Sequence, residues 1–163
     1  MFLKSAAVAL TALLATSLTA KAETIPVLVP ITGFLSLEGT SQRNGAMLAI
    51  ERYGKDLGLD AEVTDTGTSP EGAVTALRRA LEDEPSAAVA SMLGTQMLAM
   101  LPIAGRAGVP LLTVSGTAKI TEIGIPWVFR FFPGDSVVKV AQARYAVEEL
   151  GAKRPALLYQ TTA

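Results

Sequence analysis

Apolar and polar residues follow one another along this chain in blocks that predict strands and helices in strict alternation. Residues 25–32 are apolar and β-branched, as in a buried parallel strand, and residues 41–55 then carry apolar side chains at helical spacing. The same succession continues downstream, with strands expected at 59–65, 87–93, 109–113 and 127–132 and helical segments after Ser69-Pro70, at 96–107 and at 117–123. This order predicts an α/β fold, a mostly parallel sheet with helices on both faces.

A second unit is expected to begin after Pro133. The tripeptide Pro133-Gly134-Asp135 interrupts the pattern, and a helix ended by Gly151 and a strand at 156–160 are predicted beyond it. One helix and one strand cannot bury a core of their own. We therefore expect residues 23–133 to form one unit. Residues 134–163 either begin a second domain or pack on the first.

The first 22 residues have the pattern of a cleavable signal peptide. A short positive region with Lys4 precedes an apolar run at residues 6–18, and Ala20-Lys21-Ala22 places small residues at the positions that signal peptidase reads. The apolar run is short for a membrane anchor and is interrupted by Ser and Thr. No cysteine stands near the cleavage site to carry a lipid. The sequence therefore predicts export to a Gram-negative periplasm.

The composition of the chain excludes several kinds of functional site. The 163 residues include no cysteine and no histidine, which excludes disulfides and thiolate or imidazole nucleophiles, and the acidic residues lack the spacing of a metal site. The net charge is −1, or −3 without residues 1–22, and gives no reason to expect nucleic acid as a partner. Neither a G-x-G-x-x-G motif nor a P-loop follows the first strand. We expect neither an enzyme nor a bound cofactor.

Two polar loops form the candidate ligand site. Gly94 and Thr95 follow the third predicted strand, and Ser115 and Thr117 follow the fourth. In an open α/β sheet such loops meet at the carboxyl ends of neighbouring strands, where ligands bind. Hydroxyls and free backbone N–H groups at two helix starts suit an anionic group such as a carboxylate. The alternative is that these hydroxyls only cap helices.

Four short pieces of the sequence resemble the periplasmic leucine/isoleucine/valine-type (type I) substrate-binding proteins of ABC importers. They are Val29-Pro30-Ile31-Thr32-Gly33 with Asn44-Gly45-Ala46, then Thr64-Asp65-Thr66, then Gly108-Val109-Pro110 leading into Thr113, and finally Phe129-Arg130 followed by Pro133 and Asp135. The resemblance covers the chain from about Ile25 to Ala163 and only the N-terminal portion of such proteins. It implies two lobes that enclose a small solute. Residues 23–133 would then be an incomplete N-terminal ligand-binding lobe, and residues 134–163 the beginning of a second, truncated lobe.

The resemblance also implies site residues, because the first lobe of these proteins binds the carboxylate and ammonium groups of the ligand. Carried over by position, the contacting residues are Gly94, Thr95, Ser115, Thr117 and Glu38. Many relatives have a serine-rich loop where this chain has residues 93–97, so either Gly94 or Thr95 takes the leading position. Glu38 stands where an aromatic residue often lines the pocket, and it either pairs with an ammonium group or is merely solvated.

The function implied is an extracytoplasmic receptor that delivers an amino acid or a similar small polar solute to the membrane subunits of an ABC permease. Two alternatives remain open. One is a ligand-sensing domain of the same fold, and the other is a truncated chain without function. Unpaired sheet edges would also favour self-association. The sequence does not name the solute.

Overall fold

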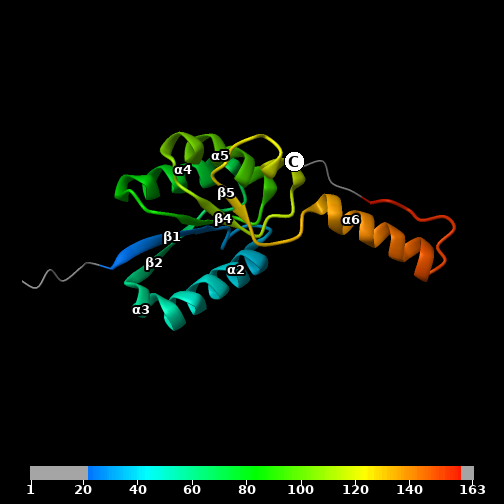
Figure 1. The fold of residues 1–163 in the computed structure, drawn as a ribbon, viewed down its shortest axis with the longest axis horizontal. Helices are drawn as coiled ribbons and strands as arrows, with labels where there is room; N and C mark the ends of the chain where they lie inside the picture. The colour runs from blue at the N-terminus through cyan, green and yellow to red at the C-terminus, as the bar shows by residue number, and fades with distance from the viewer. Residues whose placement is uncertain (1–21, 159–163) are drawn as a thin grey trace, which may run out of the picture.

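The computed structural model of the chain describes residues 22–158, which contain a five-stranded parallel sheet (Figure 1). The strands are β1 (Glu23–Val29), β2 (Leu59–Asp65), β3 (Ala88–Ala90), β4 (Leu111–Thr113) and β5 (Val128–Arg130). Their order across the sheet is β2-β1-β3-β4-β5, and every neighbouring pair is parallel. The chain therefore winds outward in both directions from β1, and the loops after β1 and β3 diverge at the carboxyl edge of the sheet.

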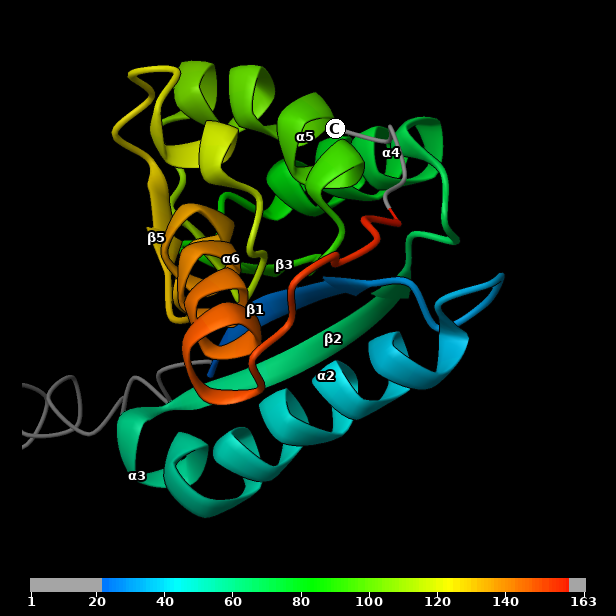
Figure 2. The same cartoon turned by 90° about the vertical axis from the view of Figure 1, so that its right-hand side faces the viewer.

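Helices cover both faces of this sheet, which confirms the predicted fold class. The helical segments are α2 (Ser36–Ala49) continued through a π-helical turn (Ile50–Gly54) into α3 (Lys55–Leu57), α4 (Pro70–Ala80) with a 3-10 turn (Leu81–Asp83), α5 (Gly94–Ala107), a 3-10 turn (Ala118–Thr121), and α6 (Asp135–Arg144) with a π-helical turn (Tyr145–Glu149). Figure 2 shows α4 and α5 on one face and α2 on the other.

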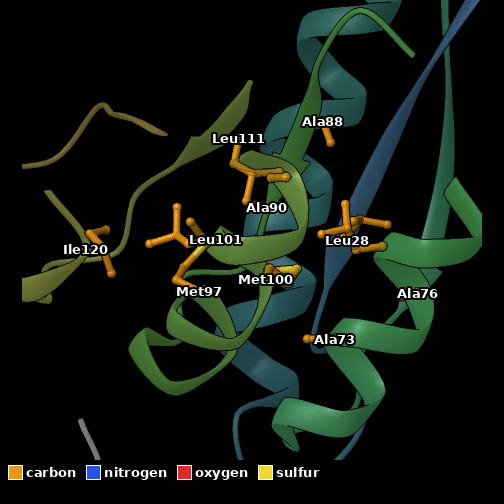
Figure 3. Close-up of a cluster of buried hydrophobic side chains, with 12 residues drawn as sticks. Leu28, Ala73, Ala76, Ala88, Ala90, Met97, Met100, Leu101, Leu111 and Ile120 are labelled. Atoms are coloured by element: carbon orange, nitrogen blue, oxygen red, sulfur yellow. The ribbon is translucent and has the colours of Figure 1, made fainter. Parts of the chain in front are cut away.

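The hydrophobic core lies between the sheet and the α4–α5 layer. Its buried members are Leu28, Ala73, Ala76, Leu77, Ala88, Ala90, Met97, Met100, Leu101, Ala104, Leu111 and Ile120 (Figure 3). Helix α4 begins where Ser69 and Pro70 predict, and the Ser69 hydroxyl accepts a hydrogen bond of 3.0 Å from the Gly72 N–H. The helix side chains buried in this core are alanine and leucine on α4, and mainly methionine and leucine on α5.

The opposite face is covered only in part. An open apolar groove of about 850 Å³ runs beside α2. Its lining residues are Leu37, Glu38, Ser41, Gln42, Gly45, Ala46, Ala49, Val89, Met92, Leu112, Thr113, Val114 and Phe131. Phe131 has 72% of its surface exposed there. The sheet is thus buried on its α4–α5 face and accessible on part of its α2 face.

Several predicted boundaries differ from the observed ones. Helix α2 begins at Ser36, five residues earlier than expected, because the turn at Gly33 is followed at once by helical backbone. Strands β3, β4 and β5 each have only three residues, so the apolar runs around them include loop segments. Residues 156–158 are not a strand, and the rest of the strand predicted at 156–160 lies outside the described residues, as does the signal segment 1–21.

Helix α6 extends away from the sheet (Figure 1) and contains no buried residue. Val137 and Val140 are exposed on it. The boundary expected at residues 133–135 directly precedes this helix, and the assignment of residues 134–163 to a second lobe stays a prediction. Between residues 22 and 158, no helix is both long and apolar enough to cross a membrane.

Two glycines of α2 offer a matched test of how this helix packs on the loop after β1. A Cβ atom at Gly39 would overlap the carbonyl oxygen of Pro30, whereas one at Gly45 would meet nothing within 4 Å. Gly39→Ala should therefore lower the free energy of unfolding by about 1–3 kcal/mol. Gly45→Ala should leave it unchanged or raise it by up to about 1 kcal/mol through helix propensity. Urea unfolding of both variants checks this, and equal effects would contradict the packing.

Candidate ligand-binding site

The structure brings the loops after β3 and β4 into contact at the carboxyl edge of the sheet. Gly94, the first residue of α5, packs so closely on the Thr117 side chain that a Cβ atom at residue 94 would overlap the Thr117 hydroxyl. Thr95 and Thr117 are both half-buried. Three of the five predicted residues, Gly94, Thr95 and Thr117, thus border one small region of the surface.

The start of α5 leaves its backbone donors available in this region. The residue that precedes the helix is Leu93, which has no side chain able to cap it and forms no side-chain cap hydrogen bond. The first N–H groups of any α-helix lack intrahelical acceptors and carry a partial positive charge. An anion at Gly94 and Thr95 would complete these hydrogen bonds.

The capping alternative does not account for the hydroxyls in this region. Thr117 directly precedes the 3-10 turn Ala118–Thr121, yet its side chain makes no cap hydrogen bond. Thr95 lies within α5 rather than at its cap position. Neither threonine therefore has the role that hydroxyls at helix starts most often have.

Ser115 lies deeper than the threonines, with 1% of its surface exposed. Among the described residues its hydroxyl oxygen is a buried side-chain atom without a hydrogen-bond partner. A buried hydroxyl left unpaired typically costs about 1–3 kcal/mol, so native structures rarely keep one without a reason. The hydroxyl can both donate and accept a hydrogen bond, and it belongs to the same loop as Thr117.

The loop that carries Ser115 and Thr117 is fixed by groups from the next elements along the chain. The Arg130 guanidinium donates a hydrogen bond of 3.1 Å from Nη1 to the Thr117 carbonyl oxygen. The Asp135 N–H, at the start of α6, donates one of 2.7 Å to the Gly116 carbonyl oxygen. Both bonds use the carbonyl groups of the loop, so they hold the loop while leaving its hydroxyls free.

Glu38 is not brought to this region by any contact of the described residues. It lies in the first turn of α2 rather than in a loop, because the helix starts earlier than predicted. Its side chain is exposed and lines the apolar groove beside α2. The helix start expected at residue 41 is therefore wrong, while a ligand role for Glu38 stays a prediction.

A buried glutamine that sequence reasoning missed supports the neighbouring loop. Gln96 on α5 is fully buried, and its amide nitrogen donates to the carbonyl oxygens of Thr66, Gly67 and Ser69 at 3.0–3.2 Å. The Thr66 hydroxyl donates in turn to the Gln96 carbonyl oxygen at 3.0 Å. The signal in the sequence was a polar residue between the apolar positions of α5, where only a fully hydrogen-bonded side chain is tolerated.

Asp65 ties the loop after β1 to the end of β2. Its carboxylate accepts hydrogen bonds from the N–H groups of Ile31 and Gly67, at 3.0 and 2.8 Å, and from the N–H and hydroxyl of Thr32. Partial burial acts to raise the pKa of Asp65, but these hydrogen bonds outweigh it and lower the pKa below its ordinary value. The residue thus serves as a structural clamp in its ionised form.

Polar groups thus gather at the carboxyl edge of a parallel α/β sheet, beside a helix start that no side chain caps. Within residues 22–158, no group of three or more His, Cys, Asp or Glu side chains is placed to hold a metal ion.

Comparison with known proteins places this lobe in a family. Residues 23–163 match the family described as periplasmic binding protein, and the chain belongs to that family, in its type I form. A curated relative, the leucine-, isoleucine-, valine-, threonine- and alanine-binding protein of Pseudomonas aeruginosa, is 27% identical over 146 residues, which are 85% of this chain and 39% of that protein.

Two solved structures are similar to the chain. A leucine-binding protein from Thermotoga maritima has a TM-score of 0.74 and 30% identity, over 81% of this chain and 39% of that one. A branched-chain amino acid transporter substrate-binding protein from Streptococcus pneumoniae, solved with isoleucine, has a TM-score of 0.72 and 25% identity, over 82% and 40%. The chain thus spans about two fifths of the length of these relatives. Members of this kind are substrate-binding proteins rather than enzymes.

The Asp65 clamp predicts a specific pH dependence of stability. Because the folded-state pKa lies below the unfolded value of about 3.9, the stabilisation is complete above that value and is lost as the pH falls through the folded pKa. Asp65→Asn should therefore be less stable than the original chain at pH 7, and the difference should shrink towards pH 3. Urea unfolding at several pH values measures it, with Glu62→Gln on the same strand as the charge control. A difference that is constant from pH 7 to pH 3 would contradict the clamp.

Proposed function

We propose that the chain is the extracytoplasmic solute-binding component of an ABC importer and binds an amino acid or a similar small polar solute at the carboxyl edge of its sheet. The observation that carries the proposal is the buried Ser115 hydroxyl, which has no hydrogen-bond partner and lies in the loop that meets the uncapped start of α5. A bound anion would give partners to both features.

The ligand group that fits this region best is a carboxylate. Its two oxygens accept several short hydrogen bonds at once, and bonds to a charged acceptor are stronger than neutral ones. The N–H groups of Gly94, which is buried, and of Thr95, and the hydroxyl of the half-buried Thr117, are the donors that we assign to the carboxylate. Since Ser115 lies below them, its hydroxyl would join only when the loop adjusts around the ligand.

The relatives support an amino acid as the ligand. The Pseudomonas protein is named for leucine, isoleucine, valine, threonine and alanine, and the Streptococcus structure contains isoleucine. These amino acids share a carboxylate and a small or apolar side chain. Export through the N-terminal segment and delivery to permease subunits complete the proposed role, in keeping with the periplasmic binding protein family.

Calorimetric titration with leucine, isoleucine, valine, threonine and alanine tests the proposal. The described residues provide one wall of the site, so we expect weak binding, with a Kd on the order of 1 mM for at least one of them. The matching amines without a carboxylate, such as isoamylamine, should not bind. A folded chain that binds none of the amino acids, or that binds the amines equally well, would overturn the proposal.

Two variants separate ligand contact from structural support. Ser115→Ala removes a hydroxyl that bonds to nothing, so the free energy of unfolding should stay the same or rise by about 1 kcal/mol. The affinity for the amino acid should nevertheless fall about 5–10-fold, as should that of Thr117→Val.

The control variant is Thr75→Val. It changes an exposed threonine on α4, outside these two loops, and its affinity for the amino acid should equal that of the original chain. Unchanged affinity in both site variants would exclude these hydroxyls as ligand contacts.

We further propose that the chain self-associates through the uncovered edges of its sheet. Strands β2 and β5 are the two edges, and the apolar groove with Phe131 adjoins β4. Exposed strand edges and apolar surface both favour association. Light scattering after size-exclusion chromatography should show the apparent mass rising with concentration, and Phe131→Ser should weaken the effect. A constant monomer mass at high concentration would contradict it.

A further inference from the structure

Thr113, the last residue of β4, links the ends of two strands through its hydroxyl. The residue has 1% of its surface exposed. Its Oγ1 donates a hydrogen bond of 2.8 Å to the carbonyl oxygen of Ser91, at the end of β3, and accepts one of 3.0 Å from the N–H of Ser115. The hydroxyl thus donates one bond and accepts another, with one bond to each of the loops that meet at the candidate site.

Gln42 on α2 holds the β3 side of this linkage from the opposite face of the sheet. Its amide nitrogen donates to the Ala90 carbonyl oxygen at 2.8 Å, and its carbonyl oxygen accepts from the Met92 N–H at 3.1 Å. The two bonds fall on either side of Ser91. The Ser91 hydroxyl then accepts a bond of 3.0 Å from the Leu93 N–H, directly before α5.

These contacts form one continuous series from α2 across β3 to the loop after β4. It starts at Gln42, passes through the backbone around Ser91 and the Thr113 hydroxyl, and ends at the Ser115 N–H. None of these bonds uses the Thr95, Ser115 or Thr117 hydroxyls. The series therefore sets where the candidate ligand contacts lie without occupying them.

We propose that Thr113 and Gln42 are positioning residues for the ligand site: they hold the start of α5 and the loop at residues 115–117 at the separation that a carboxylate requires. This inference rests on the proposed function for its ligand. Its physical basis is preorganisation, since donors that are already fixed lose less conformational entropy when the ligand binds. Thr113 has the larger effect because it bonds directly to Ser115.

Two substitutions at Thr113 separate the role of its hydroxyl from the role of its volume. Thr113→Val keeps the shape of the side chain but removes the hydroxyl, which leaves the Ser91 carbonyl and the Ser115 N–H without their partner. Thr113→Ser keeps the hydroxyl and loses only a methyl group. A residue that merely filled space would tolerate the valine better than the serine, so the order of the two variants distinguishes positioning from packing.

The first readout needs no ligand. Amide hydrogen exchange measured by NMR on the full chain should show faster exchange at Ser115 in Thr113→Val, by about tenfold or more, while core amides such as Leu101 stay protected. Thr113→Ser should exchange at Ser115 as the original chain does. In Gln42→Met, a second variant for the case that Thr113→Val does not fold, the amide of Met92 should exchange faster in the same way.

The second readout is affinity for leucine, isoleucine, valine, threonine and alanine. We expect Thr113→Val to bind about tenfold more weakly, and Gln42→Met about threefold, with Thr113→Ser close to the original chain. If the original chain binds none of these, the proposed function fails while the exchange data still decide whether Thr113 fixes the loop. Unchanged Ser115 exchange and unchanged affinity in a folded Thr113→Val would overturn the positioning role.

Discussion

The packing of α4 and α5 against one face of the sheet is the interaction on which the rest of the structure depends. Leu28 from β1, Leu77 from α4 and Leu101 from α5 are fully buried there together. Five parallel strands have their carboxyl ends on one side, so this packing also gathers every strand-end loop along a single edge. The position of the candidate site follows from the core.

A dry core directly beneath that edge imposes a second requirement, because polar groups at the strand ends lose contact with water. Side chains form hydrogen bonds to these backbone groups. Gln96 does so from α5 and Gln42 from α2. Asp65 and Thr113 form such bonds from the ends of their strands. Ser115 differs, because its buried hydroxyl has no hydrogen-bond partner among the described residues, and this is why we propose a ligand there.

The alternation of strands and helices was predictable because burial on both faces gives parallel strands continuous apolar runs, as at residues 25–32. Ser69-Pro70 located the start of α4 for an equally local reason. The ends of the strands and helices were harder to predict from the sequence. The apolar runs at β3 and β5 continue into loop residues, among them the exposed Phe131 and Phe132, and periodicity does not distinguish these from strands. The early start of α2 moved Glu38 from a loop into a helix, since no capping side chain marks that start.

In the candidate site too, some features could be predicted from local sequence patterns and others could not. That the loops with Gly94 and Thr117 meet was predictable, because the carboxyl ends of neighbouring strands adjoin, whereas the ligand role of their residues stays a prediction. The supporting residues Gln42 and Thr113 were not, since their partners are backbone groups brought close only by the fold, 48–50 residues away for Gln42 and 22 for the bond from Thr113 to Ser91. Sequence patterns report burial and local turns, whereas hydrogen bonds between distant segments depend on how the helices pack.

The most direct test of the central claim is an NMR titration of the chain with leucine, isoleucine, valine, threonine and alanine, followed at every backbone amide. The account predicts that the largest shifts occur at Gly94, Thr95, Gly116 and Thr117, around the start of α5 and the loop after β4. Chemical-shift changes confined to the groove beside α2 would contradict this claim. So would the absence of any change in a folded chain at ligand concentrations well above about 1 mM, the Kd expected for one wall of a site.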